Sequence, residues 1–317
     1  MRLLLRFVSK NVGVAIVQIF IVATLVFLLL RFMPGVPAVL VLGTERGADP
    51  AAVEAMRATL GLDQPLLTQY FTWFADILRL DFGQSLFNNI DVTTYLAERL
   101  PKTLELAIVA IIIGSIIGIS LGIIAAVKRG GVVDMIVSSI AAAGLSFPVY
   151  VTGTVLILLL SLQLNLLPAS GYTAFSEDPV AHIQKLFLPA ITVALPLAAS
   201  IARMTRSSML EVLGKDFVQT LRAKGLAEKM IIFKHVLRNA IISVITVIGL
   251  ELANLIGGTV LIEFLFNWPG LSSLLVESIN NRNYPIIQGS IIVIAAFYIL
   301  INRAVEIIYG LMDPRTR

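Results

Sequence analysis

Six long apolar stretches constrain the fold of this chain more than any other feature of its sequence. They cover residues 12–30, 103–127, 135–162, 188–205, 240–262 and 286–308. A bilayer core about 30 Å thick needs about 20 mostly apolar residues per helix. Backbone amides in lipid must be paired within the protein, and these runs do not alternate as barrel strands do. The sequence therefore predicts an all-α integral membrane protein with six transmembrane helices, the third kinked at Pro148.

The composition also rules against a soluble fold. Of 317 residues, 57% are hydrophobic and 14% are charged, against about 45–50% and about 25% in a typical soluble domain. The first stretch follows Arg2, Arg6 and Lys10, which is the order found in a secretory signal. It is too long for the apolar part of a signal, and no small-residue cleavage site follows it. We therefore expect a retained first helix.

Lysine and arginine predict the orientation in the membrane. The segments and helix ends that would face one side hold 16 of the 24 basic residues, although the opposite segments are longer. Cytoplasmic loops carry such an excess, so we expect both termini in the cytoplasm. The same asymmetry accounts for the net charge of +4, and a nucleic-acid partner is not expected.

The reactive side chains form no recognisable centre. The chain has no cysteine, so it has neither a disulfide framework nor a thiolate metal site. In the predicted topology His182 and His235 lie in loops on opposite sides of the membrane. Gly214-Lys215 lacks the flanking residues of a phosphate-binding loop. We therefore predict no catalytic, metal-binding or cofactor-binding residues. If the chain takes part in active transport, either an ion gradient or a partner ATPase is expected to supply the energy.

The stretches divide the chain into segments by side of the membrane. We predict a cytoplasmic N-terminus with the first helix (1–30), an extracytoplasmic helical cap (31–102), a five-helix core (103–310) and a cytoplasmic tail (311–317). Within the cap, residues 49–60 and 66–80 have helical character. The cap is either a structural lid or a contact surface for a protein that delivers substrate.

The cytoplasmic loop 206–239 of the core predicts a helical hairpin. Asp216 is expected to cap a helix over 217–224, with Gln219 completing a capping box, and Gly225 to end it in the left-handed conformation. A second helix is expected from residue 227 towards residue 239.

The first helix of this hairpin carries a mixed surface. Phe217 and Leu221, four residues apart, are expected to form an apolar knob flanked by Arg222 and Lys224. Taken alone, the pattern also fits a basic loop that only fixes topology.

Residues 216–226, followed by His235-Val-Leu-Arg-Asn-Ala240, resemble the cytoplasmic EAA loop of peptide-class ABC importer permeases. Gln219-Thr220-Leu221 stands where the general pattern has Glu-Ala-Ala, and Leu237-Arg238 replaces Leu-Pro. Further motifs similar to B-type permeases follow in order along the chain, with Gly35-Val36-Pro37 in place of Gly-Asp-Pro. They are Met33-Pro-Gly35, Leu60-Gly-Leu-Asp-Gln-Pro-Leu66, Asp81-Phe-Gly83, Arg99-Leu-Pro101 with Thr103-Leu-Glu-Leu106, Trp268-Pro-Gly-Leu271, Asn281-Arg282 with Tyr284-Pro285, and Asp313-Pro-Arg315.

The resemblance is to the B-type transmembrane permease of the peptide/nickel (dipeptide/oligopeptide) ABC importer family. It implies a type I importer permease fold in a bacterial or archaeal plasma membrane. It also implies a C-type permease partner, two ATP-binding subunits that bind ATP and Mg, and an extracytoplasmic substrate-binding protein. Peptides are the favoured substrate, with nickel chelates, glutathione or oligosaccharides as alternatives. The residues implied in coupling to the ATPase are Asp216, Phe217, Leu221, Arg222, Lys224, Gly225 and Leu226.

Glu251 is an acidic residue well inside the fifth stretch, with Asn254 on nearly the same helical face. An intramembrane carboxylate is costly and normally faces an aqueous path or a partner. Both alternatives, a pathway-lining role and pairing with a buried group, stay open. A secondary transporter would be expected to supply more intramembrane charge, and a membrane-embedded enzyme would need a reactive cluster.

Small residues recur every four positions in the second stretch. They permit close helix approach, either within the chain or to a partner. They are Ala110, Gly114, Gly118, Gly122 and Ala126.

Overall fold

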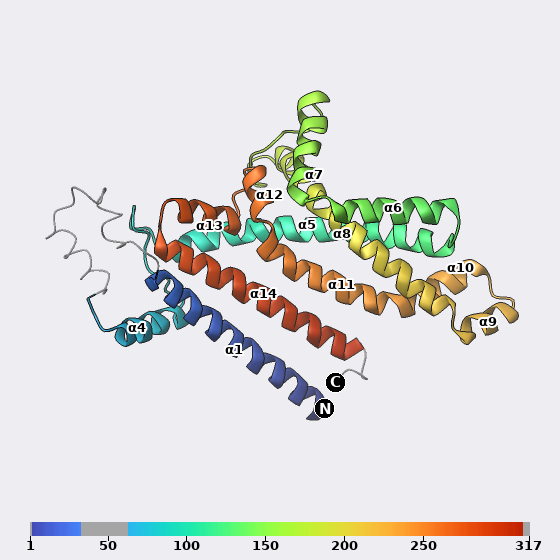
Figure 1. Cartoon of the computed structure of the whole chain (residues 1–317), viewed down its shortest axis with the longest axis horizontal. Helices are drawn as coiled ribbons and strands as arrows, with labels where there is room; N and C mark the ends of the chain where they lie inside the picture. The colour runs from blue at the N-terminus through green and yellow to red at the C-terminus, as the bar shows by residue number, and fades with distance from the viewer. Residues whose placement is uncertain (1, 33–62, 313–317) are drawn as a thin grey trace. The chain divides into compact units, whose positions relative to one another are not determined.

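The computed structural model describes residues 2–32 and 63–312, and in these ranges every regular element is a helix (Figure 1). An isolated antiparallel bridge joins Gln84 and Asp91. Five helical segments are long and apolar enough to cross a membrane, or six if one sharply bent pair counts as a single span. The predicted all-helical fold is confirmed.

The first, second and sixth predicted stretches lie within single long helices. These are α1 (Arg2–Phe32), α5 (Val92–Val127) and α14 (Tyr284–Met312). The fourth lies within α8 (Pro179–Leu213), which begins where the Asp178 carboxylate accepts hydrogen bonds from two backbone amides. Each helix extends beyond its apolar stretch, because helical backbone pairing does not stop where the apolar residues do.

The third stretch is broken rather than merely kinked. Helix α6 (Val132–Ser146) is followed by α7 (Val149–Leu156) and the π-helix η1 (Ile157–Gln163), and the two halves meet at 103°. Pro148 lacks a backbone N–H and disfavours helical geometry at the residue before it. Phe147 accordingly has φ −92° and ψ 134°. The predicted position of the kink at Pro148 is confirmed, but the chain is broken there and not merely kinked.

The fifth stretch belongs to a helical run that starts outside it. Helix α10 (Glu228–Met230), the π-helix η2 (Ile231–Val236) and α11 (Leu237–Gly258) follow one another without a gap. A break at Thr259 separates α11 from the short helix α12 (Val260–Leu265). The predicted span 240–262 therefore ends four residues beyond α11, and its helical run begins well before residue 240.

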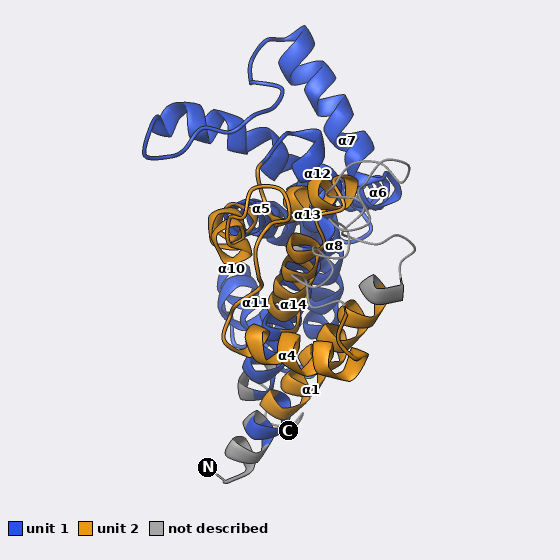
Figure 2. Ribbon diagram, turned by 90° about the vertical axis from the view of Figure 1, so that its left-hand side faces the viewer, with its two compact units in different colours: residues 1–11, 104–268, 300–317 blue, residues 12–103, 269–299 orange. Residues whose placement is uncertain are grey.

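The chain forms two compact units (Figure 2). Unit 1 comprises residues 1–11, 104–268 and 300–317, and unit 2 comprises residues 12–103 and 269–299. The units group residues by contact, whereas the predicted segments divide the chain by side of the membrane. That division therefore stays a prediction.

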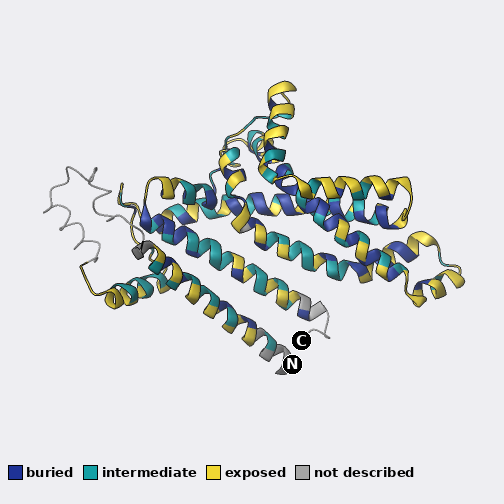
Figure 3. Ribbon diagram, viewed as in Figure 1, coloured by how far each residue is buried: buried dark blue, intermediate teal, exposed yellow. Residues whose placement is uncertain are grey.

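Helix α8 is the centre of unit 1, packed against α6, α7 and α11, with buried residues along its length (Figure 3). Its main apolar cluster includes Leu188 and Ile201 of α8, Leu106 of α5, Val244 of α11 and Trp268. This packing gives the cavities described below a fixed wall.

The small residues of α5 pack against α8 within the chain. A Cβ atom added at Gly118 would lie 2.7 Å from the carbonyl oxygen of Ala198, and one added at Gly122 would lie 2.5 Å from Cβ of Thr205. Of the two readings of this stripe, intrachain packing is the one that the structure shows.

Unit 2 contains the described part of the predicted cap. Helix α4 (Leu66–Leu78) confirms the helix expected over 66–80, whereas residues 49–60 lie outside the described residues. Phe20 of α1 meets Phe74 of α4 edge-on at 5.4 Å between ring centroids. A second cluster joins the start of α5 to α13 (Leu271–Asn280), where the amide of Leu271 donates to Thr103.

Neither histidine lies in a loop, which corrects that expectation. His182 is in the first turn of α8, buried, with its ring nitrogens 2.7 Å from the carbonyl oxygen of Thr173 and 2.8 Å from Oε1 of Glu105. His235 lies in η2. The hydrogen bond between His182 and Glu105 joins residues 77 positions apart, which no local pattern reveals.

Candidate functional site

The loop between α8 and α11 folds as the predicted helical hairpin, within unit 1 (Figure 1). Its first helix, α9, runs from Asp216 to Ala223 and is followed by α10. The expected cap is wrong by one residue: Lys215 occupies the N-cap position, and no side chain caps the helix. The amide of Val218 instead bonds the carbonyl of Lys215. Asp216 lies in the first turn, where the helix dipole favours a negative charge.

Gly225 ends α9 as predicted, with φ +77°. Its amide donates to the carbonyl of Arg222 at 2.9 Å, and the amide of Leu226 donates to the carbonyl of Leu221 at 3.3 Å. This pair of hydrogen bonds is the Schellman arrangement, in which a left-handed residue lets the chain reverse and satisfies the last carbonyls of a helix. The turn into α10 is therefore fixed by the backbone.

One face of α9 is anchored on the chain's own core. Val218 is fully buried, and Leu221 and Leu226 pack against a cluster that includes Met209 of α8 and Ile231 of η2. The expected joint knob of Phe217 and Leu221 is thus wrong, since Leu221 turns inward with Val218. Phe217 is 39% exposed and remains on the outer face.

The outer face of the hairpin is polar around Phe217. Asp216, Arg222 and Lys224 are exposed. Arg222 donates to both carboxylate oxygens of Glu228, at 2.6 and 3.2 Å, which links α9 to α10 across the turn. The hydrogen bond and charge of Glu228 raise the pKa of Arg222 above its usual value. Helix α9 therefore presents the ring of Phe217 among exposed charged side chains.

The structure places Glu251 and Asn254 together in a cavity of about 200 Å³. Glu251 is half-buried on α11 and accepts a hydrogen bond of 2.8 Å from the hydroxyl of Ser200 on α8. The carboxylate thus has a polar partner inside the chain and still borders a cavity. Among the described residues it forms no ion pair.

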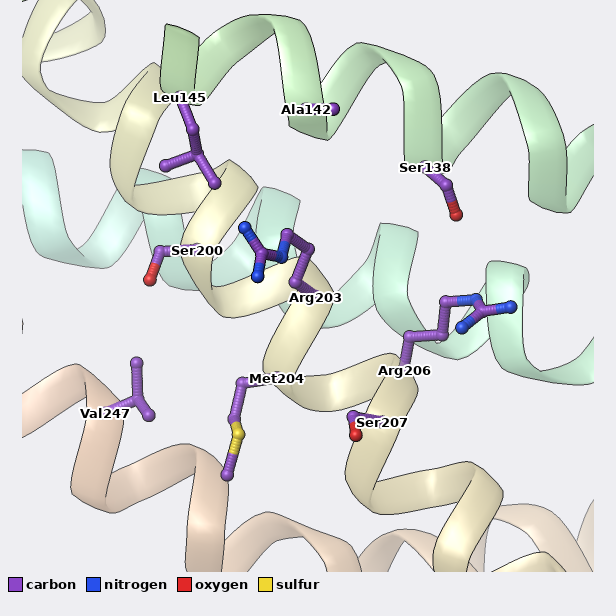
Figure 4. A pocket seen from close by; sticks show the side chains of 9 residues that line it. All are labelled: Ser138, Ala142, Leu145, Ser200, Arg203, Met204, Arg206, Ser207 and Val247. Atoms are coloured by element: carbon purple, nitrogen blue, oxygen red, sulfur yellow. The ribbon is translucent and has the colours of Figure 1, made fainter.

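A larger cavity of about 670 Å³ lies between α6, α8 and α11 (Figure 4). It shares Leu145 with the smaller cavity. Its lining residues are Ser138, Ala142, Leu145, Ser200, Arg203, Met204, Arg206, Ser207 and Val247. Figure 4 shows Arg203 extending from α8 towards α6, and Met204 extending towards α11.

The two arginines of this cavity differ in their partners. Arg206 donates to both carboxylate oxygens of Asp134, at 2.6 and 2.8 Å, and Asp134 also accepts from the amide of Gly130. In the described part of the chain, no hydrogen bond or ion pair engages the side chain of Arg203. Sequence reasoning missed this cavity, although two arginines three residues apart at the end of an apolar stretch were a signal for it.

Within residues 2–32 and 63–312, no group of three His, Asp or Glu side chains could hold a metal ion. The B-type motifs at residues 33–37 and 313–315 lie outside those ranges, as do residues 60–62 of the motif at 60–66.

Two family models cover most of the chain. The model described as binding-protein-dependent transport system inner membrane component matches residues 118–317. A model for the N-terminal part of the same membrane component matches residues 4–107.

Similar proteins extend over the full length. A probable peptide ABC transporter permease of Sinorhizobium fredii (strain NBRC 101917 / NGR234) is 42% identical over 319 residues, which is 99% of this chain and 98% of the relative. A glutathione transport system permease of Escherichia coli (strain K12) is 40% identical over 314 residues, 99% of each chain. A structure of the methionine ABC transporter MetNI in inward-facing conformations has a TM-score of 0.58 at 19% identity, covering 69% of this chain and 96% of that one. That last likeness concerns the fold alone.

Proposed function

The chain belongs to the family of binding-protein-dependent transport system inner membrane components, the permeases of ABC importers, and from that premise we propose that it forms half of a translocation pathway for peptides. It is a multi-pass membrane protein. The observation that carries the peptide assignment is the full-length similarity to a peptide permease at 42% identity. The cavities beside α8 supply space and polar groups along such a path.

In this proposal the hairpin of α9 and α10 couples transport to a separate ATPase. Its inner face, with Val218 and Leu221, is anchored on the core, so a force on the outer face is transmitted to α8 and η2. Phe217 is the exposed apolar contact on α9, and Asp216, Arg222 and Lys224 are exposed on the same helix and its C-cap. Gly225 and Leu226 hold the turn that orients this face.

The assembly that fits these roles has four further subunits. We infer a C-type permease, two ATP-binding subunits and an extracytoplasmic substrate-binding protein. ATP and Mg bind to the ATP-binding subunits, and this chain is a non-catalytic translocation subunit. Both termini would then face the cytoplasm, and the cap would face the binding protein.

A second substrate is favoured by a specific observation. The glutathione permease of Escherichia coli is 40% identical over 99% of this chain, nearly as similar as the peptide permease. Glutathione is itself a small peptide with free charged groups. Uptake of radiolabelled dipeptides and of glutathione by the same reconstituted importer, each in competition with the other, would separate the two.

The test of the importer function measures energy coupling. The purified chain is expected to hydrolyse no ATP, whereas the chain co-purified with its ATPase subunits hydrolyses ATP and, with the binding protein, drives uptake into proteoliposomes. A matched complex with Phe217→Ala, which keeps the buried face of α9, should lose most of that uptake. Robust hydrolysis by the chain alone at high purity would contradict a permease role.

A further inference from the structure

The cavity between α6, α8 and α11 contains a cation that the coupling role leaves unused. Arg203 lines this cavity, and within the described residues no hydrogen bond or ion pair neutralises its guanidinium. Arg206, also on the cavity wall, donates from Nε and one terminal nitrogen of its guanidinium to the two carboxylate oxygens of Asp134. Arg203 therefore supplies the positive charge that is open to a ligand.

A negative charge lies beside the same wall. Ser200 lines the cavity and donates to Oε1 of Glu251 at 2.8 Å. Ser200 and Arg203 are three residues apart on α8, a rise of about 4.5 Å along a helix. In the part of the chain that the structure describes, Arg203 and Glu251 form no ion pair with each other. Opposite charges that stay apart inside a membrane protein normally face water, a ligand or a partner.

We propose that this pair of charges binds a zwitterionic short peptide, with Arg203 at its carboxylate end and Glu251 at its ammonium end. The proposal rests on the proposed function and adds the chemical feature by which the permease itself recognises its substrate. A guanidinium matches a carboxylate with two parallel hydrogen bonds. Two or three extended residues span at most about 7–11 Å. Ser200, which holds the Glu251 carboxylate, lies one helical turn from Arg203 on α8.

The rest of the wall suits a variable peptide. Ala142, Leu145, Met204 and Val247 provide apolar surface on the cavity wall beside Ser200 and Arg203 (Figure 4). Methionine is flexible and polarizable and adapts to ligands of different shape. The volume of about 670 Å³ lies inside the range of about 300–1,000 Å³ typical of small-ligand sites. The site should therefore require free termini and tolerate different side chains.

The experiment measures dipeptide binding to the importer complex without its substrate-binding protein. Any preference among dipeptides is then a property of the permease. The probes are alanylalanine, its N-acetyl derivative and its C-terminal amide, titrated by calorimetry. The wild-type complex should bind the free dipeptide about tenfold or more tightly than either derivative, the size expected for one charge-assisted contact. Arg203→Gln should abolish only the preference for a free carboxylate. Glu251→Gln should abolish only the preference for a free ammonium group.

Matched variants distinguish recognition from misfolding. Arg203→Lys should keep part of the carboxylate preference, and Arg238→Gln and Glu211→Gln, at exposed positions outside the cavity, should keep both preferences. The proposal is overturned if the wild-type complex binds no dipeptide at millimolar concentration or ignores the state of the termini. It is also overturned if Arg203→Gln only impairs assembly, as loss of a lipid or partner-permease contact would. ATP-dependent peptide uptake is scored separately: uptake without terminus selection removes this inference and leaves the proposed function standing.

Discussion

Gly225 is the residue whose backbone geometry most directly sets the orientation of the hairpin. Its φ of +77° lies in the left-handed region, and a Cβ there would have no neighbour within 4 Å. A substitution would therefore act through backbone strain and not through a clash with other side chains. The strain for a β-branched residue is roughly 1–2 kcal/mol or more.

Gly225→Val should consequently misplace Phe217 while leaving the lipid-facing helices intact. We expect uptake and substrate-stimulated ATP hydrolysis to fall in parallel in reconstituted complexes, with normal amounts of protein in the membrane. Gly225→Asn is the matched control, because Asn adopts the left-handed conformation more readily and should retain most activity. Wild-type stimulation and uptake in the Val variant would mean that the loop only fixes topology.

The sequence predicted the conformation of Gly225 correctly, but it did not predict the N-cap of α9 or the direction of Leu221. A glycine at a helix end is a local signal, since the left-handed conformation depends on that residue itself. The cap at Asp216 and the direction of Leu221 depend on where the helix starts and on which core it meets. The direction of Leu221 depends on contacts with α8 and η2. A ten-residue window of sequence around α9 contains neither helix.

Helix α5 approaches α8 so closely that the smallest side chain is required. A Cβ at Gly122 would lie 2.5 Å from Cβ of Thr205 and 2.7 Å from the carbonyl oxygen of Ala202. One contact is with backbone, so the overlap can be relieved only by separating the helices. Overpacking of this kind destabilises by about 1–3 kcal/mol.

Gly122→Ala should therefore lower the thermal unfolding temperature of the purified permease. Gly257→Ala is the matched control inside α11, because a Cβ at Gly257 has no neighbour within 4 Å. That exchange should be neutral or slightly stabilising, as alanine favours helix by about 1 kcal/mol over glycine. Equal unfolding temperatures for the two variants would contradict the close α5–α8 packing.

Apolar length predicted where the long helices lie, because lipid imposes that length on each span. The break in the third stretch followed from Pro148, but its angle of 103° did not. The π-helices η1 and η2 were not predicted either. In a π-helix each hydrogen bond spans one more residue than in an α-helix, so it changes the face on which the following side chains lie.

The cavity between α6, α8 and α11 could not be predicted from separate segments of the sequence. Its lining residues come from α6, α8 and α11 and span positions 138 to 247. Glu251 was recognisable from its depth in an apolar stretch. Arg203 was counted only as a topology charge, because its lack of a partner becomes visible when α6 and α8 are packed together.

The orientation of the chain in the membrane is the whole-molecule property that the basic residues predict, and the absence of cysteine makes it testable. Asp63 and Lys229 are both exposed in the structure, so burial hides neither from a reagent. The excess of lysine and arginine around Lys229 indicates the cytoplasm, whereas Asp63 belongs to the predicted cap. In intact cells, a membrane-impermeant maleimide should therefore label Asp63→Cys and spare Lys229→Cys. Permeabilised cells should label both equally, and the cysteine-free parent should give no signal. Labelling of Lys229→Cys alone in sealed cells would invert the topology, and it would place the hairpin of α9 and α10 on the side away from any ATPase.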